Sequence, residues 1–496
     1  MFHSRVIITK SKASAVQVVR YEARKRVVVK HIGSANNEQE LLALKLLAGQ
    51  VICELTMQLT MFKESNPTNL LSIDNAEFLG VYYTFLYEVL IGVFNQIGLS
   101  KSDNKLLMDL AAIRILEPAS KLRSIELLKT YFGIKHRRQN YYAAAPKWLL
   151  QKERIEKSVA QFAQSEYSFN YDILFYDVTT LYFETFEDDA LRKQGFSKDN
   201  KSQQPQILVA LMVTKDGLPI AYEIFAGNTF EGHTILPVVQ SFIKQNKVNH
   251  FTIIADAAMI SSTNVEALKK ANIHYIVGAR LGNLSAAQIE QIDKTIIRED
   301  GKAMRINTAN GYLICSYSNL RYRKDKYEME KQIEKAKSII EKPSKNKKLK
   351  FTKSTGEKVN LNNVLINKTK KLLGIKGYYT DLEETVASNQ TIIERYHELY
   401  KIEQAFRISK SDLQTRPIFH FKEEPIQLHL LICFMALVAS KHIELKTGVS
   451  IKKFITECKK IQDARMLNTI TNKQITMRTK LNPEIMDYLS KLNLPH

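Results

Sequence analysis

The chain of 496 residues is 45% hydrophobic, which fits a folded globular protein, and its length exceeds what one core usually organises, so two or three domains are expected. Its net charge of +21 predicts a polyanionic partner, with nucleic acid ahead of an anionic membrane surface. The four scattered cysteines show no Cys-x-x-Cys spacing, which supports neither a zinc ribbon nor a disulfide framework and predicts a reducing, intracellular compartment.

Residues 1–165 are predicted to form an N-terminal region of strands followed mostly by helices. The start, MFHSRVIITK, lacks the regions of a signal peptide, and β-branched runs in the first thirty residues predict a small strand meander. From residue 37 apolar positions recur at helical spacing, as in NAEFLGVYYTFLYEVLIGVFNQIG, with a break between two later helices at Glu117 and Pro118. The basic and aromatic segment KHRRQNYY is interpreted as a solvated loop in preference to a DNA contact.

From residue 172 the pattern changes to that of a mixed sheet covered by helices. Short β-branched or aromatic runs, separated by Gly, Asp and Pro, predict the strands DILFYDV, PQILVALMVT, LPIAYEIFAG, FTIIADAA and HYIVGAR. Helical segments lie between the third and fourth runs and between the fourth and fifth. Because the runs show little alternation, we expect central strands buried on both faces, which is an α/β fold.

The chain beyond Arg280 is predicted to be less regular. Residues 281–380 begin with one or two β-hairpins and continue into a charged helix and the Lys-rich stretch PSKNKKLKFTKSTGEK, interpreted as a surface loop ahead of a phosphate-contacting one. Residues 381–435 hold the long helix QTIIERYHELYKIEQAFRISKSDL and then LHLLICFMALVAS, which is too short for a bilayer and is predicted to be a buried helix. Residues 436–496 are basic and predicted to be helical, and no membrane partner is expected.

Three acids stand out by their position in these elements. Asp177 is predicted to end the first strand, Asp256 to end the fourth, and Glu403 to lie in the long helix. Carboxylates at the ends of neighbouring strands can converge at one sheet edge and offer the oxygen ligands that Mg²⁺ prefers. Two such ions can serve phosphodiester chemistry, so the three acids are the candidate catalytic and metal-binding residues.

The long helix provides a second argument. Tyr396, Glu403 and Lys410 are spaced seven apart, so an ideal helix places them on one face, beside Leu399 and Phe406. A Glu on an otherwise apolar stripe needs a metal or a cationic partner. A structural salt bridge from Glu403 to Lys410 or Arg407 explains it as well as a metal does.

Other polar residues have structural explanations that compete with functional ones. Glu231 and His233 precede a helix, where capping and the helix dipole explain an acid, and a supporting role beside the metals is the alternative. Arg280, at a strand end, is equally suited to a DNA phosphate and to a salt bridge. Thr179 and Thr180 are interpreted as sheet or turn residues. The acids interpreted as solvated are Glu184, Asp188 and Asp189.

Six blocks, taken in order, make a family resemblance specific. The blocks YDVTTLYFE, GFSKD, PQILVALMVTKDGLPIAYEIFAGNTFEGHT, IIADAAM, YIVGARL and YHELYKIEQAFRISKSDL together resemble the DDE transposases of bacterial insertion sequences, in the branch with a Tyr-x2-Arg-x3-Glu-x6-Lys signature. The likeness covers roughly residues 170–435. It implies a ribonuclease H-like catalytic domain, a mixed sheet flanked by helices, with a β-rich insertion at 281–380 between the second Asp and the Glu helix.

The resemblance assigns roles to particular residues. It makes Asp177, Asp256 and Glu403 the three acids that bind two divalent cations, Mg²⁺ with Mn²⁺ as substitute. Tyr396 and Lys410 fall on the signature's Tyr and Lys, which face the DNA end in this family, whereas Leu399 stands where the signature has Arg. Arg395, Lys401 or Arg407 are the candidates to supply that missing charge, and Arg280 and Arg407 join Tyr396 and Lys410 as candidate DNA contacts.

The predicted function is a cytoplasmic, nucleoid-associated transposase that binds the terminal inverted repeats of its element and acts on double-stranded DNA at the ends and at the target. It is expected to cut each end by metal-dependent hydrolysis, to join the 3′-OH to target DNA, and to work as a homodimer on DNA. The N-terminal region is expected to recognise the repeat, and residues 436–496 to serve dimerisation or DNA contact. The rivals are a non-catalytic, transposase-derived DNA-binding repressor and another metal-dependent phosphotransferase, such as a phosphatase with Asp177 as nucleophile.

Overall fold

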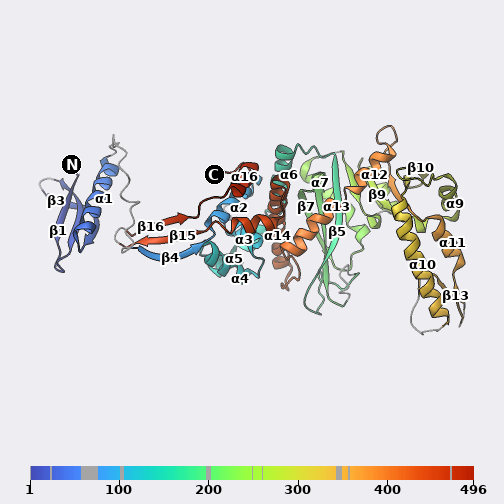
Figure 1. The fold of residues 1–496 in the computed structure, drawn as a ribbon, viewed down its shortest axis with the longest axis horizontal. Coiled ribbons are helices and arrows are strands. Elements are labelled where there is room, and N and C mark those ends of the chain that lie inside the picture. The colour runs from blue at the N-terminus through green and yellow to red at the C-terminus, as the bar shows by residue number, and fades with distance from the viewer. Residues whose placement is uncertain are drawn as a thin grey trace. The chain divides into compact units, whose positions relative to one another are not determined.

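The computed structural model describes residues 2–22, 25–56, 76–100, 105–196, 203–248, 250–259, 261–341, 349–355, 358–469 and 472–495. Parts of GFSKD and of the Lys-rich stretch 343–358 lie outside these residues. In the described part of that stretch, residues 352–355 form a strand and Phe351 is buried, so the surface-loop interpretation is wrong there. The chain forms two compact units, and neither is continuous in sequence (Figure 1). The first comprises Met1–Val89, Glu126–Lys135 and Lys453–His496, and the second comprises Leu90–Ile125 and His136–Lys452.

The first unit begins with the predicted strand meander. Strands β1 (Phe2–Ile8), β2 (Ser14–Glu22) and β3 (Lys25–Ala35) form an antiparallel sheet in the order β1-β2-β3. Helix α1 (Glu38–Thr56) packs on this sheet through a small apolar core that includes Val16, Val18, Leu44 and Ala48. The prediction of short strands followed by a helix is therefore confirmed here.

A second sheet of this unit contradicts two sequence predictions. It has the order β16-β15-β4, with β4 at Ala76–Tyr82, β15 at Asp463–Asn468 and β16 at Lys473–Arg478. The start of the segment NAEFLGVY was predicted as helix, and residues 436–496 as helical throughout; both predictions are wrong at these strands. A short apolar run fits either period, and the partner that makes AEFLGVY a strand lies near the opposite end of the chain. Helix α16 (Pro483–Lys491) follows, capped by Asn482, whose side chain accepts from the Ile485 N–H.

The second unit is built on an eight-stranded mixed sheet. Its order is β10-β11-β14-β9-β8-β5-β6-β7. Strands β5, β6 and β7 are antiparallel neighbours, while β8 and β9 run parallel to β5. The five strands predicted between residues 172 and 280 are all present, and the bounds of the eight are β5 (Ile173–Tyr182), β6 (Gln206–Thr214), β7 (Pro219–Ala226), β8 (Thr252–Ala255), β9 (His274–Ala279), β10 (Ala303–Thr308), β11 (Gly311–Tyr317) and β14 (Ile375–Thr380).

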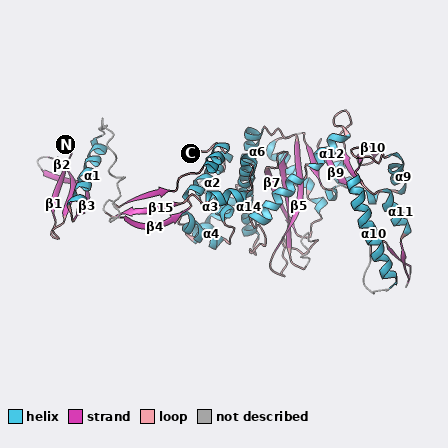
Figure 2. Ribbon diagram, in the orientation of Figure 1, coloured by secondary structure: helices cyan, strands magenta, loops and turns pink. Residues whose placement is uncertain are grey.

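Helices cover the central strands, as predicted (Figure 2). Alternate residues of β5 show the two faces. Thr179 and Leu181 line a small apolar cavity with Phe406 of α13 and Phe434 of α14, whereas the hydroxyl of Tyr176 lies 2.6 Å from that of Thr234, the residue before α7. Successive side chains of a strand point to opposite faces, so Asp177 shares the face of α13. The helices that contact the sheet are α6 (Lys152–Tyr167), α7 (Ile235–Asn246), α8 (Ser262–Lys270), α12 (Asn389–His397), α13 (Tyr400–Arg407) and α14 (Glu423–Thr447).

Helix α14 is the core helix of the unit. Among the described residues it is the one helix long and apolar enough to cross a membrane, but 94% of its most apolar window is buried inside the fold. It packs against α3 (Lys105–Leu116) and α5 (Arg138–Leu149), so its apolar side chains are covered by protein, as predicted for LHLLICFMALVAS. The predicted break at Glu117 and Pro118 separates α3 from α4 (Lys121–Leu127). Helices α2 (Thr84–Ile97) and α15 (Ile451–Cys458) each contain a boundary between the two units.

The segment 281–380 is not the β-rich insertion that was predicted. Its strands β10, β11 and β14 extend the main sheet, since Gly377 of β14 pairs with Ala279 of β9. The remainder is mostly helical and has a small core of its own that includes Phe351 and Ile366. These elements are α9 (Ala286–Thr295), α10 (Asn319–Glu341), α11 (Asn363–Lys371) and the short hairpin of β12 (Thr352–Thr355) and β13 (Lys358–Leu361). Turn-rich sequence around short strands suggested a β segment, but tertiary pairing assigns its longer strands to the central sheet.

Candidate active site

Asp177 and Asp256 come from neighbouring parallel strands. Asp177 was predicted to end its strand, but it lies in the middle of β5. The strand continues because β6 pairs with β5 as far as Tyr182. Strand β8 pairs with β5 through Tyr176 and Ala255 and then stops, so Asp256 follows at the next step. Asp177 and Asp256 are therefore the next residues after the last paired positions of β5 and β8, and they lie side by side where β8 ends. Asp177 is half-buried and Asp256 is exposed.

The helix that carries Glu403 is not continuous. Helix α12 ends at His397 and α13 starts at Tyr400, with a tight turn in which the Leu399 N–H donates to the Tyr396 carbonyl at 3.1 Å. A bond three residues back tightens the turn relative to an α-helix, and a π-helical turn at Ile408–Asp412 follows α13. The predicted stripe at ideal spacing therefore does not hold: Tyr396 is buried and Glu403 is exposed.

One cavity nevertheless gathers the three predicted acids. It has a volume of about 400 Å³, and Asp177, Asp256 and Glu403 all line it. The other lining residues are Lys376, Tyr396, His397, Leu399 and Tyr400. The acids reach it from β5, from the end of β8 and from α13, segments that are far apart in the chain. Their catalytic role stays a prediction.

Tyr396 links the helix to the second acid. Its phenol lies close enough to the Asp256 carboxylate for the two groups to interact electrostatically. Burial raises the pKa of the Tyr396 phenol, and the negative charge of Asp256 raises it further, so the hydroxyl stays protonated and able to donate. Its ring packs edge-on against Tyr378 of β14, with centroids 4.8 Å apart.

Lys376, on β14, was not identified from the sequence. Its Nζ lies 4.8 Å from the ring centroid of Tyr396 and 5.5 Å from that of Tyr378. Burial, with the positive charge of Arg321, lowers the pKa of Lys376, while the charges of Asp256 and Glu403 oppose that shift. The available signal was a lysine two residues before an aromatic residue in GIKGYYT, on the same face of a predicted strand.

His397 and Tyr400 complete the cavity wall and were also missed. Nε2 of His397 lies 3.2 Å from the hydroxyl of Tyr378, and burial lowers the pKa of the His397 imidazole. The side chain of Tyr400 is 50% exposed, so an aromatic surface stands beside the acids and faces solvent. Both residues flank the turn between α12 and α13. In an uninterrupted helix their side chains would point in other directions.

The predicted DNA contacts are only partly gathered at this cavity. Tyr396 lines it, while Arg407, which is exposed, and Lys410, which is partly buried, are not among its lining residues. Arg280 is exposed at the end of β9 and lines a different cavity, of about 370 Å³, beside Ala257.

The substitutes considered for the missing signature Arg do not line the acid cavity either. The Nζ of Lys401 donates to the Lys215 carbonyl at 2.6 Å and pairs with Glu398 at 3.1 Å. Among the described residues, Lys376 is the one lysine or arginine that lines the cavity, and Leu399 lines it too.

The secondary candidates have mixed outcomes. Thr179 and Thr180 are buried sheet residues in β5, as predicted. Glu231 and His233 lie in a 3₁₀ turn before α7. No side-chain hydrogen bond caps α7, so the part of the interpretation that expected a capping hydrogen bond is wrong. Among the three acids predicted to be solvated, Glu184 and Asp188 are exposed, but Asp189 pairs with Arg192 at 2.6 Å.

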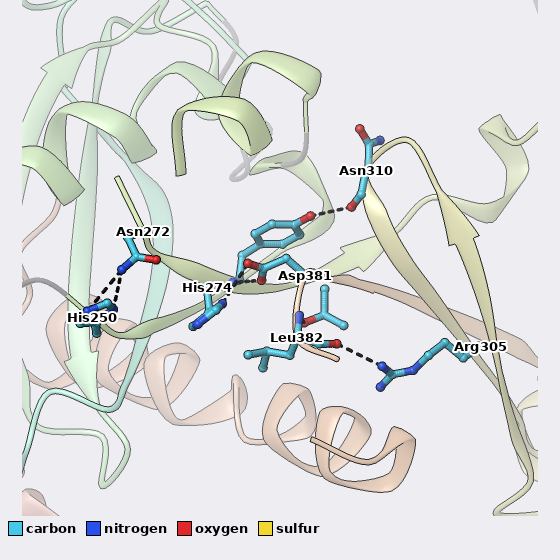
Figure 3. Close-up of polar contacts among 9 residues, drawn as sticks. His250, Asn272, His274, Arg305, Asn310, Asp381 and Leu382 are labelled. Atoms are coloured by element: carbon cyan, nitrogen blue, oxygen red, sulfur yellow. Dashed lines mark hydrogen bonds and ion pairs between the residues drawn. The ribbon is translucent and has the colours of Figure 1, made fainter. Parts of the chain in front are cut away.

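A network of hydrogen bonds holds the loop that leads into α12 (Figure 3). The guanidinium of Arg305, on β10, donates to Asn389 Oδ1 at 2.8 Å, to the Leu382 carbonyl at 3.0 Å and to the Ala387 carbonyl at 2.9 Å. The carboxylate of Asp381 accepts from the Tyr275 N–H at 3.0 Å and lies 2.9 Å from Nδ1 of His274. The loop is thereby tied to β9 and β10, which sets where α12 starts.

The donor set suits a hard divalent cation. Three carboxylates line a space that also admits water, and Mg²⁺ takes oxygen ligands and keeps several waters. Within the described ranges, no three or more His, Cys, Asp or Glu side chains are gathered tightly enough to hold a metal ion by themselves. What favours a divalent cation here is the chemistry of the three carboxylates that line one cavity.

Comparisons with known proteins assign part of the chain to a family. Residues 168–439, more than half of the chain, match the family model described as "Transposase DDE domain". No curated protein matches the chain. A cryo-EM structure of a piggyBac transposase synaptic complex with hairpin DNA shares 11% sequence identity and a TM-score of 0.39, covering 75% of this chain and 76% of that one. The family match includes all three acids.

Proposed function

The chain belongs to the Transposase DDE domain family, and from this premise we propose that it moves a bacterial insertion sequence by acting on both ends of the element. It binds the terminal inverted repeats, cuts the phosphodiester at each end, and joins the freed 3′-OH to target DNA. The observation that carries the proposal is the single cavity shared by Asp177, Asp256 and Glu403.

The strand order supports a ribonuclease H-like catalytic domain. Three antiparallel strands, β7, β6 and β5, are followed across the sheet by the parallel strands β8 and β9. This arrangement brings Asp177 of the central strand next to Asp256 after its parallel neighbour. The acid-bearing α13 packs on β5 and β6.

Asp177, Asp256 and Glu403 would hold the divalent cations, two Mg²⁺ ions with Mn²⁺ as substitute. When bound, such ions supply Lewis-acid stabilisation to both the attacking and the leaving oxygen of an in-line displacement at phosphorus. The chain itself contributes position and charge. The Tyr396 hydroxyl orients the Asp256 carboxylate, and the position of Glu403 follows from the turn between α12 and α13.

Basic side chains around the cavity hold the DNA. Lys376 supplies positive charge inside the cavity, in the role that the signature gives to an Arg where this chain has Leu399. Arg280, Arg407 and Lys410, with Tyr396, contact the DNA end, and the net charge of +21 supports association with a polyanion. The N-terminal region recognises the repeats, and a homodimer pairs the two ends.

Metal-dependent cleavage tests the proposal. A labelled duplex that carries the end of the flanking element is incubated with the full chain and Mg²⁺ or Mn²⁺, and with EDTA as control. We expect nicking at the element boundary with either ion and none with EDTA. Binding without cutting under all conditions would support the repressor, and release of phosphate from a monoester without DNA cutting would support the phosphotransferase.

Lys376→Met is expected to slow cleavage by about 10²-fold, the usual loss when one preorganised electrostatic contact to a reacting group is removed. Lys376→Arg should retain most of the activity because the charge stays. The measurement is the single-turnover cleavage rate at saturating DNA, with the exposed Lys370→Met as matched control. An unchanged rate in Lys376→Met would refute the proposed role.

Gly278→Ala is expected to displace Tyr396 from Asp256. A Cβ at Gly278 would lie 2.5 Å from the Tyr396 hydroxyl, and the side-chain end can move more easily than the sheet. We expect a loss of stability of about 1–3 kcal/mol and slower cleavage with unchanged DNA affinity. Thermal unfolding and cleavage assays check this against Gly282→Ala, where an added Cβ meets no atom within 4 Å. If Gly278→Ala and Gly282→Ala cleave DNA at the same rate, the position of Tyr396 does not affect the reaction.

A further inference from the structure

A second cavity of the larger unit is lined by buried cations. Arg114 of α3 is 6% exposed and Lys121, the first residue of α4, is 7% exposed. Both contact His429 of α14, which is 5% exposed. The three residues come from separate helices, and none of them lines the acid cavity.

His429 is the shared acceptor of both cations. Its Nδ1 lies 3.0 Å from Nη2 of Arg114 and 3.1 Å from Nζ of Lys121, while its Nε2 lies 2.9 Å from the Thr415 carbonyl. A carbonyl can only accept, so Nε2 carries the proton and Nδ1 offers its lone pair. Burial, with the charges of Lys121 and Arg114, holds the pKa of His429 well below its usual range, which keeps the ring neutral.

The two cations have no counter-ion in the part of the chain that the structure describes. No carboxylate forms an ion pair with Arg114 or Lys121, and each makes its one side-chain hydrogen bond there to the same nitrogen. A guanidinium has five N–H donors and an ammonium has three, so most of their donor capacity is unused. Burial and the nearby Arg114 charge lower the pKa of Lys121 to about 7. Two buried positive charges without a counter-ion are therefore unfavourable at this site.

Arg114 and Lys121 also lie at an open cavity. Arg114 and Lys121 line a cavity of about 210 Å³ together with Arg416, His420 and Ser120. On the same measure a single water needs only about 10–15 Å³, so the cavity has room for a polyatomic anion. The guanidinium fork of Arg114 matches the oxygens of a phosphate in geometry as well as charge.

We propose that this cavity binds a phosphate group, with Arg114 and Lys121 as its direct donors and Arg416 at its edge. The group can come from a DNA backbone or from free phosphate. The cavity lies toward the end of β5: the Arg416 guanidinium stands 5.8 Å from the Tyr182 ring, and the Ile418 N–H donates to the Tyr182 carbonyl at 3.2 Å. Tyr182 is five residues beyond Asp177, roughly 16 Å along an extended strand.

The first test uses inorganic phosphate and no DNA. Its outcome therefore does not depend on the proposed cleavage activity. The melting temperature of the full chain is measured in rising sodium phosphate and in sodium chloride of equal ionic strength. A ligand that binds only the folded state raises it with concentration. We expect that rise in the wild type and in Lys121→Arg, and its loss in Lys121→Met and Arg114→Met. Lys294→Met, at a lysine whose side chain is 72% exposed, controls for lost surface charge.

The second arm distinguishes the source of the phosphate. Affinity for a duplex of arbitrary sequence is measured across salt concentrations for the wild type and Lys121→Met. If a backbone phosphate occupies the cavity, the slope of log affinity against log salt should fall by about 1 in the variant. An unchanged slope with a lost phosphate response would assign the site to free phosphate. A phosphate response that persists in both Met variants would overturn the proposal, as would no response in the wild type.

Discussion

Glu403→Gln is expected to bind element-end DNA as the wild type does and to cut it about 10³-fold more slowly. The substitution keeps the shape of the side chain and removes one negative charge from the cavity that it shares with Asp177 and Asp256. Charge stabilisation by a held cation contributes several kcal/mol to such a reaction, and each ~1.4 kcal/mol is a factor of ten in rate. Asp177→Asn and Asp256→Asn should have the same effect.

The comparison needs a variant that changes charge but not the cavity. Glu394→Gln serves, because Glu394 is exposed on α12 and does not line the site. Binding is measured by mobility shift and cutting by single-turnover cleavage, in Mg²⁺ and in Mn²⁺. Cleavage by Glu403→Gln at the rate of Glu394→Gln would remove Glu403 from the proposed catalytic set, whatever the result at the two Asp residues.

Arg305→Met is expected to lower the free energy of unfolding by about 2–4 kcal/mol, since it removes three hydrogen bonds from a charged group and leaves two carbonyls without that donor. We also expect cleavage to slow by about 10²-fold with DNA affinity unchanged. The loop at residues 381–388 sets the start of α12, and displacing a catalytic group by about 1 Å can cost that much. Arg305 would thus act as a positioning residue.

Arg305→Lys separates position from charge, because a lysine keeps the charge but cannot fill three acceptors in the geometry of a guanidinium fork. We expect it to resemble Arg305→Met in cleavage. Thermal unfolding and single-turnover rates at saturating DNA are measured below the melting point of every variant. Destabilisation with a normal cleavage rate would show that the loop does not control the site.

The candidate site shows how far local patterns reach. Asp177 and Asp256 could be singled out because each follows a short apolar run, and runs of that kind are strands whichever partner they pair with. That Asp177 lies inside its strand could not be predicted, because the strand's length depends on β6, whose pairing extends to Gln206. Lys376 was missed for a related reason: β14 joins the main sheet only through its pairing with β9.

Helix phase has a similar limit. An ideal helix places Tyr396 and Glu403 on one buried stripe, but two residues of tight turn between α12 and α13 change the direction of everything that follows. Local sequence contains no Pro or Gly to mark that turn. Tyr396 and Glu403 still reach one cavity, but through this interruption rather than by regular spacing.

The sequence by itself determined the class of the protein: hydrophobic period identified the five central strands and the helices between them, and the charge and the six ordered blocks indicated a DNA transposase. These properties are local or compositional, so they survive without knowledge of the fold. Only the tertiary structure decided that β4 pairs with β15, that the segment 281–380 contributes three strands to the central sheet, and that Arg114 and Lys121 meet at His429. Each of these depends on contacts between residues distant in the chain, whose free energy is realised only when the whole core packs.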